Sequence, residues 1–197
     1  MDQRTVGANP SLQAPPAGVW KFDQAHTNLS FVARYLMLTK VRGGFRDFDG
    51  ALHIEETPER SWVEVSINAA SIDTGNETRD EHLRSPDFLD VERFPKLTFR
   101  STKIERTGDT TLQVTGDLTI RDVTRPVVLD AEYEGATKGM RGDSRVAFSA
   151  KTDIDRENWG VMWNMALETG GVLVGKMVRL ELEVQAILQN AEGEETA

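Results

Sequence analysis

The sequence contains no cysteine, which excludes disulfides, thiol nucleophiles and cysteine-ligated zinc or iron–sulfur sites. Histidine is almost as scarce, with three residues in the chain, His26, His53 and His82. None of them has another histidine two or four positions away, the spacing that a strand or helix needs to present a metal-ligating pair. The sequence therefore predicts no metal site, and nothing in it indicates a cofactor.

Positive charge is also in short supply. The chain has 23 Lys and Arg against 32 Asp and Glu, a net charge of -9, and a sequence pI near 4.9. Because a nucleic-acid binder needs clustered positive charge, we expect no nucleic-acid partner. The same balance disfavours attraction of the whole molecule to an anionic membrane surface.

Long hydrophobic runs are missing. No stretch approaches the roughly 18–20 apolar residues that a membrane-spanning helix needs, and residues 1–17 hold no apolar signal-peptide core. We therefore expect no integral membrane segment and a cytoplasmic location. The polar segments 1–17 and 190–197 are predicted to be flexible, which leaves one domain over residues 18–189.

The dominant pattern is alternation of apolar and polar residues, which is typical of half-buried strands. It is clearest in residues 177–188, 111–120 and 127–134. Shorter apolar faces or plausible strands occur at 19–24, 29–37, 45–55, 63–67, 97–105 and 146–150. Eight or nine strands without regular alternation with helices predict an all-β barrel or sandwich.

Two segments break this pattern. Residues 76–85 read as a short helix that Asn76 caps and Pro86 ends. Residues 155–175 form a long loop that is rich in tryptophan and methionine. An apolar loop either folds back as part of the core or walls an apolar ligand pocket, and the sequence leaves both alternatives open.

Motifs for common chemistries are absent. There is no P-loop, no dinucleotide-binding glycine fingerprint and no G-x-S-x-G elbow. Asp153-x-Asp155 begins like a calcium loop, but Asn158 replaces the glycine that the sixth position requires. Asp23 and His26, with Ser30 nearby, are more typical of a hydrogen-bonded turn than of a triad. The sequence therefore predicts no catalytic residues.

Several motifs, in order, resemble the YceI-like family of polyisoprenoid-binding proteins. They run from residues 18–26 through 41–50, 71–88, 94–102, 116–127 and 155–160. The resemblance covers about residues 18–188 and implies an extended, antiparallel, eight-stranded lipocalin-like barrel with a hydrophobic tunnel. The chain departs from the family pattern at Tyr35, where a histidine is usual, and at Lys176, where an acidic residue is common.

What the resemblance implies is binding of a long-chain isoprenoid or a similar amphiphilic lipid, including an isoprenoid quinone, by a carrier or storage protein. We expect the loop to close one end of the tunnel and Tyr35 to contact a ligand head group. The predicted ligand-binding residues are Phe31, Tyr35, Leu36, Phe45, Phe48, Phe99, Phe148, Trp159, Met162, Trp163 and Met165.

Two other functions stay open at this point. The same apolar pocket would suit a cyclase or isomerase of small molecules, with Tyr35 or His26 as the proton donor. A barrel filled by its own side chains would instead be an interaction module without a ligand. Exposed sheet edges are compatible with a homodimer, although no residue pattern requires one.

Overall fold

The computed structural model describes residues 14–168 and 170–189. The two terminal segments that the sequence predicts to be flexible, 1–17 and 190–197, lie largely outside these ranges. Residues 14–17 are described and lie against the barrel, where the indole nitrogen of Trp20 donates a hydrogen bond to the carbonyl of Pro16 at 3.2 Å.

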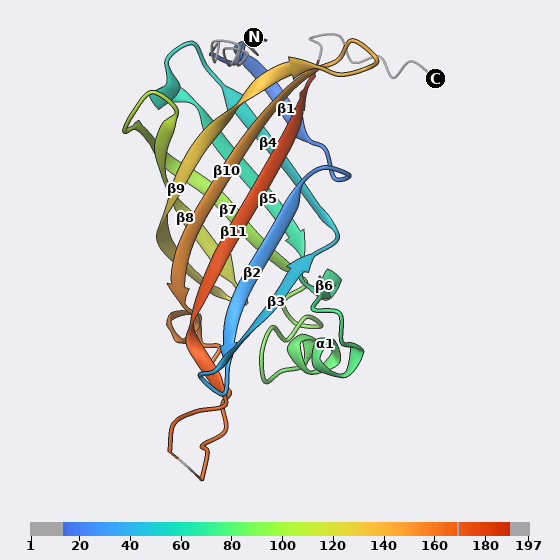
Figure 1. The fold of residues 1–197 in the computed structure, drawn as a ribbon, viewed down its shortest axis with the longest axis vertical. Helices are drawn as coiled ribbons and strands as arrows, with labels where there is room; N and C mark the ends of the chain where they lie inside the picture. Colours follow the sequence, from blue (N-terminus) through green and yellow to red (C-terminus); the bar gives the residue numbers. More distant parts are fainter. Residues whose placement is uncertain (1–13, 169, 190–197) are drawn as a thin grey trace, which may run out of the picture.

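Within the described residues, eleven strands form one antiparallel sheet, and eight of them close into a barrel (Figure 1). The closed ring follows the order β1-β4-β5-β7-β8-β9-β10-β11 and is completed by pairing of β11 with β1. This arrangement confirms the predicted eight-stranded antiparallel barrel. The ring strands are β1 (Gly18–Phe22), β4 (Phe48–Ile54), β5 (Trp62–Asn68), β7 (Lys96–Arg106), β8 (Thr111–Ile120), β9 (Val123–Lys138), β10 (Ser144–Asp155) and β11 (Val174–Leu188).

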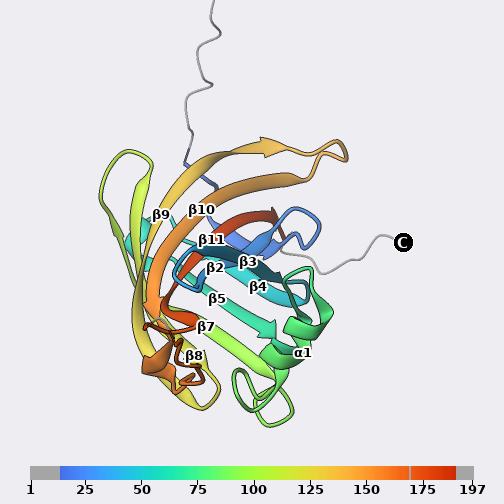
Figure 2. The same ribbon diagram turned by 60° about the horizontal axis from the view of Figure 1, so that its bottom comes forward.

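The remaining strands extend the sheet at the lower end of Figure 1. β2 (Asn28–Tyr35) pairs with the first two thirds of β11, β3 (Thr39–Phe45) pairs with β2, and β6 (Ile72–Asp73) pairs with β3. Figure 2, in which the lower end comes forward, shows the helix α1 (Glu77–Arg84) beside this end of the barrel.

The helix begins as its sequence predicts. The Asn76 side-chain oxygen accepts a hydrogen bond from the Arg79 amide at 3.0 Å, which satisfies one of the unpaired donors of the first turn. In the same first turn, the buried carboxylate of Asp80 accepts hydrogen bonds from the amide and hydroxyl of Thr74. Among the described residues, no helix is long and apolar enough to cross a membrane.

The strand boundaries differ from the sequence prediction in the region of the β2–β3 hairpin. The segment 29–37 does not continue as a strand to its end, because β2 stops at Tyr35 and the chain turns back into β3. β3 escapes a pattern-based prediction because Gly43 and Gly44 lie in it, and glycine is depleted in strands. Here Gly43 is required by close packing, since a Cβ at that position would overlap the Phe31 ring.

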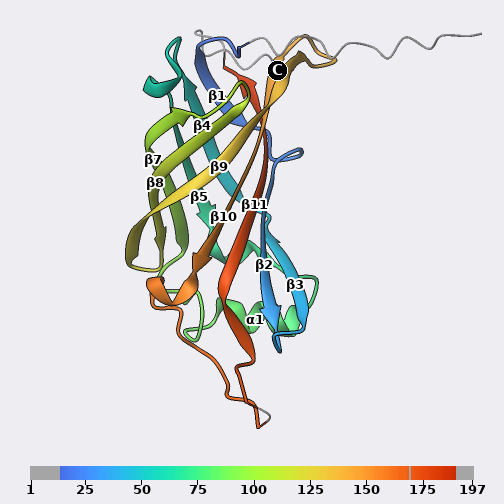
Figure 3. The same ribbon diagram turned by 60° about the vertical axis from the view of Figure 1, so that its left-hand side comes forward.

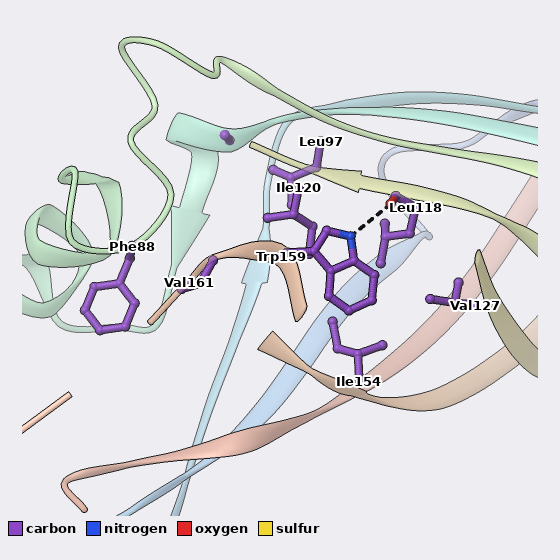
Figure 4. Packing of buried hydrophobic residues seen from close by; sticks show 9 residues of the cluster. Phe88, Leu97, Leu118, Ile120, Val127, Ile154, Trp159 and Val161 are labelled. Carbon is purple, nitrogen blue, oxygen red and sulfur yellow. Dashed lines mark hydrogen bonds between the residues drawn. The ribbon is translucent and has the colours of Figure 1, made fainter. Parts of the chain in front are cut away.

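The lower part of the barrel is filled by side chains (Figure 4). Trp159, in the short 3-10 helix Arg156–Trp159, lies at the centre of this cluster and is 3% exposed. Its indole nitrogen donates a hydrogen bond to the Leu118 carbonyl at 3.0 Å. The cluster comprises Ala69, Phe88, Leu97, Leu118, Ile120, Val127, Ile154, Trp159 and Val161.

Candidate ligand cavity

A cavity of about 460 Å³ occupies the upper part of the barrel, toward the hairpin that joins β7 to β8. Its volume falls within the range of about 300–1,000 Å³ that is usual for small-molecule pockets. The wall is mostly apolar because the inward face of each alternating strand contributes to it. Inward side chains include Phe22, Leu29, Leu52, Ile54, Val63, Val65, Phe99, Ile104, Leu112, Val114, Leu129, Ala131, Tyr133, Phe148, Ala150, Leu182 and Val184.

Phe99 separates the cavity from the packed lower half of the barrel. It lines the cavity and also packs against both the Trp159 cluster and a second cluster that contains Ile104 and Leu129. Its ring lies over Gly116 on the neighbouring strand, at a position where a Cβ atom would overlap the ring. A glycine on β8 thus allows the ring to lie close to the barrel wall.

Tyr133 brings a hydroxyl into this apolar wall. The side chain comes from β9, is 8% exposed, and packs with its ring centroid 5.2 Å from that of Phe148. Burial raises the pKa of the Tyr133 phenol above its usual value, so the hydroxyl keeps its proton at neutral pH. A neutral phenol can both donate and accept a hydrogen bond.

The cavity opens among acidic groups. Glu55 and Glu56, which follow β4, and Asp109, in the turn after β7, all line it. The basic residue in this part of the lining is Arg106, whose guanidinium donates hydrogen bonds to the carbonyls of Gly108 and Asp109 at 3.0 and 2.9 Å. The cation is therefore held against its own hairpin, and the opening has a negative balance.

Two residues of the cavity lining, His53 and Trp62, stack with Arg100 of the neighbouring strand β7. His53 and Trp62 are cross-strand partners on β4 and β5, with ring centroids 3.4 Å apart and planes inclined by 8°. The Arg100 guanidinium lies 4.6 Å from the Trp62 ring centroid. Burial lowers the pKa of the His53 imidazole, although nearby Glu64 opposes the shift.

A polar hollow of about 890 Å³ adjoins the apolar cavity, and Ala14, Thr110 and Tyr133 line both. Its cations are engaged in contacts of their own. Arg145 contacts Asp23 at 2.7 Å and Asp143 at 2.6 Å, and Lys138 donates to the Ser144 hydroxyl at 2.8 Å. Hydrogen-bonding groups therefore lie next to the apolar chamber.

The structure brings two of the predicted ligand-binding residues, Phe99 and Phe148, to the cavity wall. The other predicted aromatic residues of the barrel lie elsewhere. Phe31 and Phe45 pack against each other with centroids 6.1 Å apart, and Phe48 is buried with 4% exposure.

The predicted loop residues divide between the core and the surface. Trp159 belongs to the lower core, and Trp163 packs on His82 and Phe88, with centroids 4.6 and 5.2 Å away. Met162 and Met165 are 60% and 55% exposed. Tyr35 and Leu36 are likewise exposed, at 41% and 36%, at the end of the β2–β3 hairpin.

The base of this loop is fixed by a buried arginine. Arg156 is 6% exposed, and its guanidinium donates hydrogen bonds to the carbonyls of Val161 at 2.6 Å and Gly175 at 3.2 Å. Burial lowers the pKa of Arg156 from its usual value. Because the acceptors lie on both sides of the loop, this single side chain ties the two ends of the loop together.

The sequence analysis did not predict Tyr133, His53 or Trp62 as residues of the cavity lining. A signal existed for Tyr133, since it occupies the same alternating face as Leu129 and Ala131. No comparable signal existed for the stack, because it depends on the register that places His53 opposite Trp62. The described residues contain no group of three or more side chains arranged to hold a metal ion.

The closed antiparallel barrel and its partly open apolar cavity place the chain in the class of lipocalin-like β-barrels. The sequence profile of the YceI-like domain matches residues 20–186, and the chain belongs to this family. The UPF0312 protein SERP2314 of Staphylococcus epidermidis is 38% identical over 173 residues, which cover 87% of this chain and 98% of that protein.

Solved structures show the same fold. The YCEI protein of Campylobacter jejuni superimposes with a TM-score of 0.69 at 30% identity, over 80% of this chain and 90% of that one. A polyisoprenoid binding domain from Saccharophagus degradans superimposes with a TM-score of 0.67, over 88% of this chain and all of that one. At 11% identity, this second similarity is one of fold alone.

Proposed function

We propose that the chain is a binding protein for an isoprenoid or similar amphiphilic lipid, which it holds in the upper cavity. The observation that carries the proposal is a cavity of about 460 Å³ with a mostly apolar wall in a barrel of the YceI-like family. The name of the polyisoprenoid binding domain from S. degradans supports the same ligand class.

Burial of apolar surface supplies the driving force. Each Å² of apolar area removed from water contributes about 25 cal/mol, and ordering of a flexible chain offsets part of this gain. An isoprenoid consists almost wholly of apolar carbon, so it needs few polar contacts to bind. Polar groups for such contacts lie in the adjoining hollow.

The cavity volume limits the length of the enclosed chain. A cavity of about 150 Å³ holds one benzene molecule, and a volume near 460 Å³ is three times larger. It therefore accommodates about 18–20 carbon atoms, or roughly four isoprene units, by the same measure. The packed Trp159 cluster blocks extension downward, so the rest of a longer chain would emerge from the mouth.

The charges at the mouth favour an uncharged head group. A phosphate or diphosphate would face Glu55, Glu56 and Asp109, while Arg106 is already engaged by its own hairpin. An alcohol or a quinone carries no charge and so meets no such penalty.

The enzyme alternative has less support from the positions of its proposed proton donors. Tyr35 is exposed at the lower end of the molecule, and His26 pairs with Asp23 at 2.8 Å with its side chain 58% exposed. Neither is among the residues that line the cavity.

The first experiment is native mass spectrometry of the purified protein, followed by analysis of its organic extract. The apo form would then be titrated with geranylgeraniol, geranylgeranyl diphosphate and a long polyprenol. We expect one-to-one binding, strongest for geranylgeraniol. Absence of any bound lipid and of any uptake would overturn the proposal.

A further inference from the structure

The end of the molecule opposite the cavity mouth carries most of the exposed apolar residues. Among the described residues, eight of the eleven exposed large hydrophobic side chains belong to it, and Leu38 is 79% exposed. We call this surface the lower tip. It consists of Tyr35, Leu36, Met37, Leu38, Met162, Met165, Val172 and Met177.

The lower tip is one surface although it comes from two segments. The Leu36 amide donates a hydrogen bond to the Leu173 carbonyl at 2.7 Å, and Tyr35 pairs with Val174. Figures 1 and 3 both show the β2–β3 hairpin and the loop before β11 together at the lower end, with the loop projecting beyond the barrel. A projection of this kind exposes its apolar side chains on several sides.

The turn in this hairpin has an unusual composition. Leu36 and Met37 have φ values of 52° and 57°, in the left-handed region. Tyr35 pairs with Thr39, and the Leu38 amide donates a hydrogen bond to the Tyr35 carbonyl at 3.0 Å, so the loop has three residues. Positions with positive φ in hairpin loops are usually asparagine, aspartate or glycine, and bulky residues there are strained. Strained backbone persists mostly at functional sites. A strained turn that displays two large apolar side chains to solvent therefore points to a surface with a binding role.

The two segments that form the lower tip carry a net charge of the opposite sign to that of the whole chain. Segments 34–40 and 160–177 together contain three basic residues, Arg34, Lys40 and Lys176, and one acidic residue, Glu168. Their net charge is thus +2, whereas the whole chain carries -9. Lys176 lies 3.5 Å from Asp155, but no carboxylate among the described residues pairs with Arg34 or Lys40.

We propose that the lower tip docks the protein peripherally on an anionic lipid bilayer. Leu38 and the exposed methionines enter the interface, while Arg34 and Lys40 meet lipid head groups. Apolar burial combined with attraction of basic residues to anionic lipid is the general basis of such docking. Acidic residues that lie more than a Debye length from the bilayer, about 8 Å at physiological salt, are largely screened from it. They therefore weaken the attraction between the lower tip and the bilayer only slightly.

A bilayer fits this surface better than a protein partner does. A stable protein interface buries about 800 Å² on each side of a closely complementary patch, whereas the lower tip is a projecting hairpin and loop. Its basic groups also match an anionic surface. In the docked orientation the cavity mouth points away from the bilayer, so docking is independent of what the cavity holds.

Co-sedimentation with vesicles tests the proposal, using the full chain and sucrose-loaded vesicles of either phosphatidylcholine alone or phosphatidylcholine with phosphatidylglycerol. The Leu38→Glu/Met162→Glu variant removes tip residues, and Met140→Glu is the matched control because Met140 is fully exposed outside the lower tip. We expect binding to the anionic vesicles, a loss of at least tenfold in the tip variant, no loss in the control, and weakening with salt.

Three results would overturn the proposal. The wild-type protein could fail to bind anionic vesicles, or the tip and control variants could bind alike. Light scattering could instead show a dimer that the tip variant dissociates, which would make the lower tip an interface between two copies of the chain. Since all substituted side chains are exposed, circular dichroism should report the same fold in every variant.

Discussion

The aromatic ring of Phe99 on β7 lies over Gly116 on β8, so closely that a Cβ atom on Gly116 would overlap it. This pair forms the boundary between the two halves of the barrel interior. Above it is the cavity, and below it is the cluster around Trp159. The absence of a side chain at one residue therefore helps to determine where the cavity ends.

Gly116→Ala should displace the Phe99 ring and reduce both stability and ligand uptake. Overpacking of this kind typically costs about 1–3 kcal/mol, which urea denaturation would measure. Phe99→Leu in the same chain should relieve the overlap with the ring but not the overlap with the Arg100 carbonyl. The double variant should therefore lose somewhat less than the sum of the two single variants. Strictly additive losses would show that the ring and the glycine do not interact.

Ala131→Phe should fill the cavity from its wall. Ala131 lies on the inward face of β9, and Val128, on the outward face of the same strand, is 46% exposed. Val128→Phe is therefore a matched control that adds an aromatic ring outside the barrel. We expect at least a tenfold loss of geranylgeraniol affinity for Ala131→Phe and little change for the control, measured by fluorescence titration. Equal affinities would mean that the ligand lies elsewhere.

The all-β architecture was predictable from sequence because alternation alone assigns an inward face to each strand, whereas the choice of a barrel over a sandwich came from the family resemblance. Leu112, Val114 and Leu118 in β8 show this directly, as each is separated from the next inward residue by a polar or small one. The short helix was predictable too, because the Asn76 cap is a local signal. Both features depend on residues close together in the chain.

The position of the cavity was not predictable in the same way. Phe31 and Phe99 are both inward-facing strand residues, but Phe31 packs over Gly43 in the lower half and Phe99 reaches the cavity wall. Which of them meets a cavity depends on how the loop around Trp159 folds back into the barrel. That is a tertiary contact between distant segments, and it has no periodic signature in the sequence.

His53 should titrate below the value of about 6.5 that is normal for imidazole, because burial lowers its pKa. The unfolded chain then binds this proton at a higher pH than the folded one. Its contribution to stability is present above about pH 6.5 and is lost as the pH falls through the folded pKa. NMR titration of the ring would measure the shift directly. His53→Phe retains a ring over Trp62 and should flatten the pH dependence of unfolding below about pH 6.5. An unchanged pH dependence would contradict this assignment.

Trp159→Ala should lengthen the chain that the barrel can hold. The substitution removes the centre of the lower core and the hydrogen bond to the Leu118 carbonyl, and we expect a loss of about 3–5 kcal/mol in the free energy of unfolding. The vacated volume lies below Phe99, so the longest prenyl alcohol that is fully enclosed should increase. Mass spectrometry of bound prenols of graded length would measure this increase. Trp159→Leu offers a milder variant if the alanine variant does not fold, and Trp62→Ala, at the rim, is the control. If variant and wild type select the same length, Trp159 does not limit the cavity, and the ligand chain must end against another part of the wall.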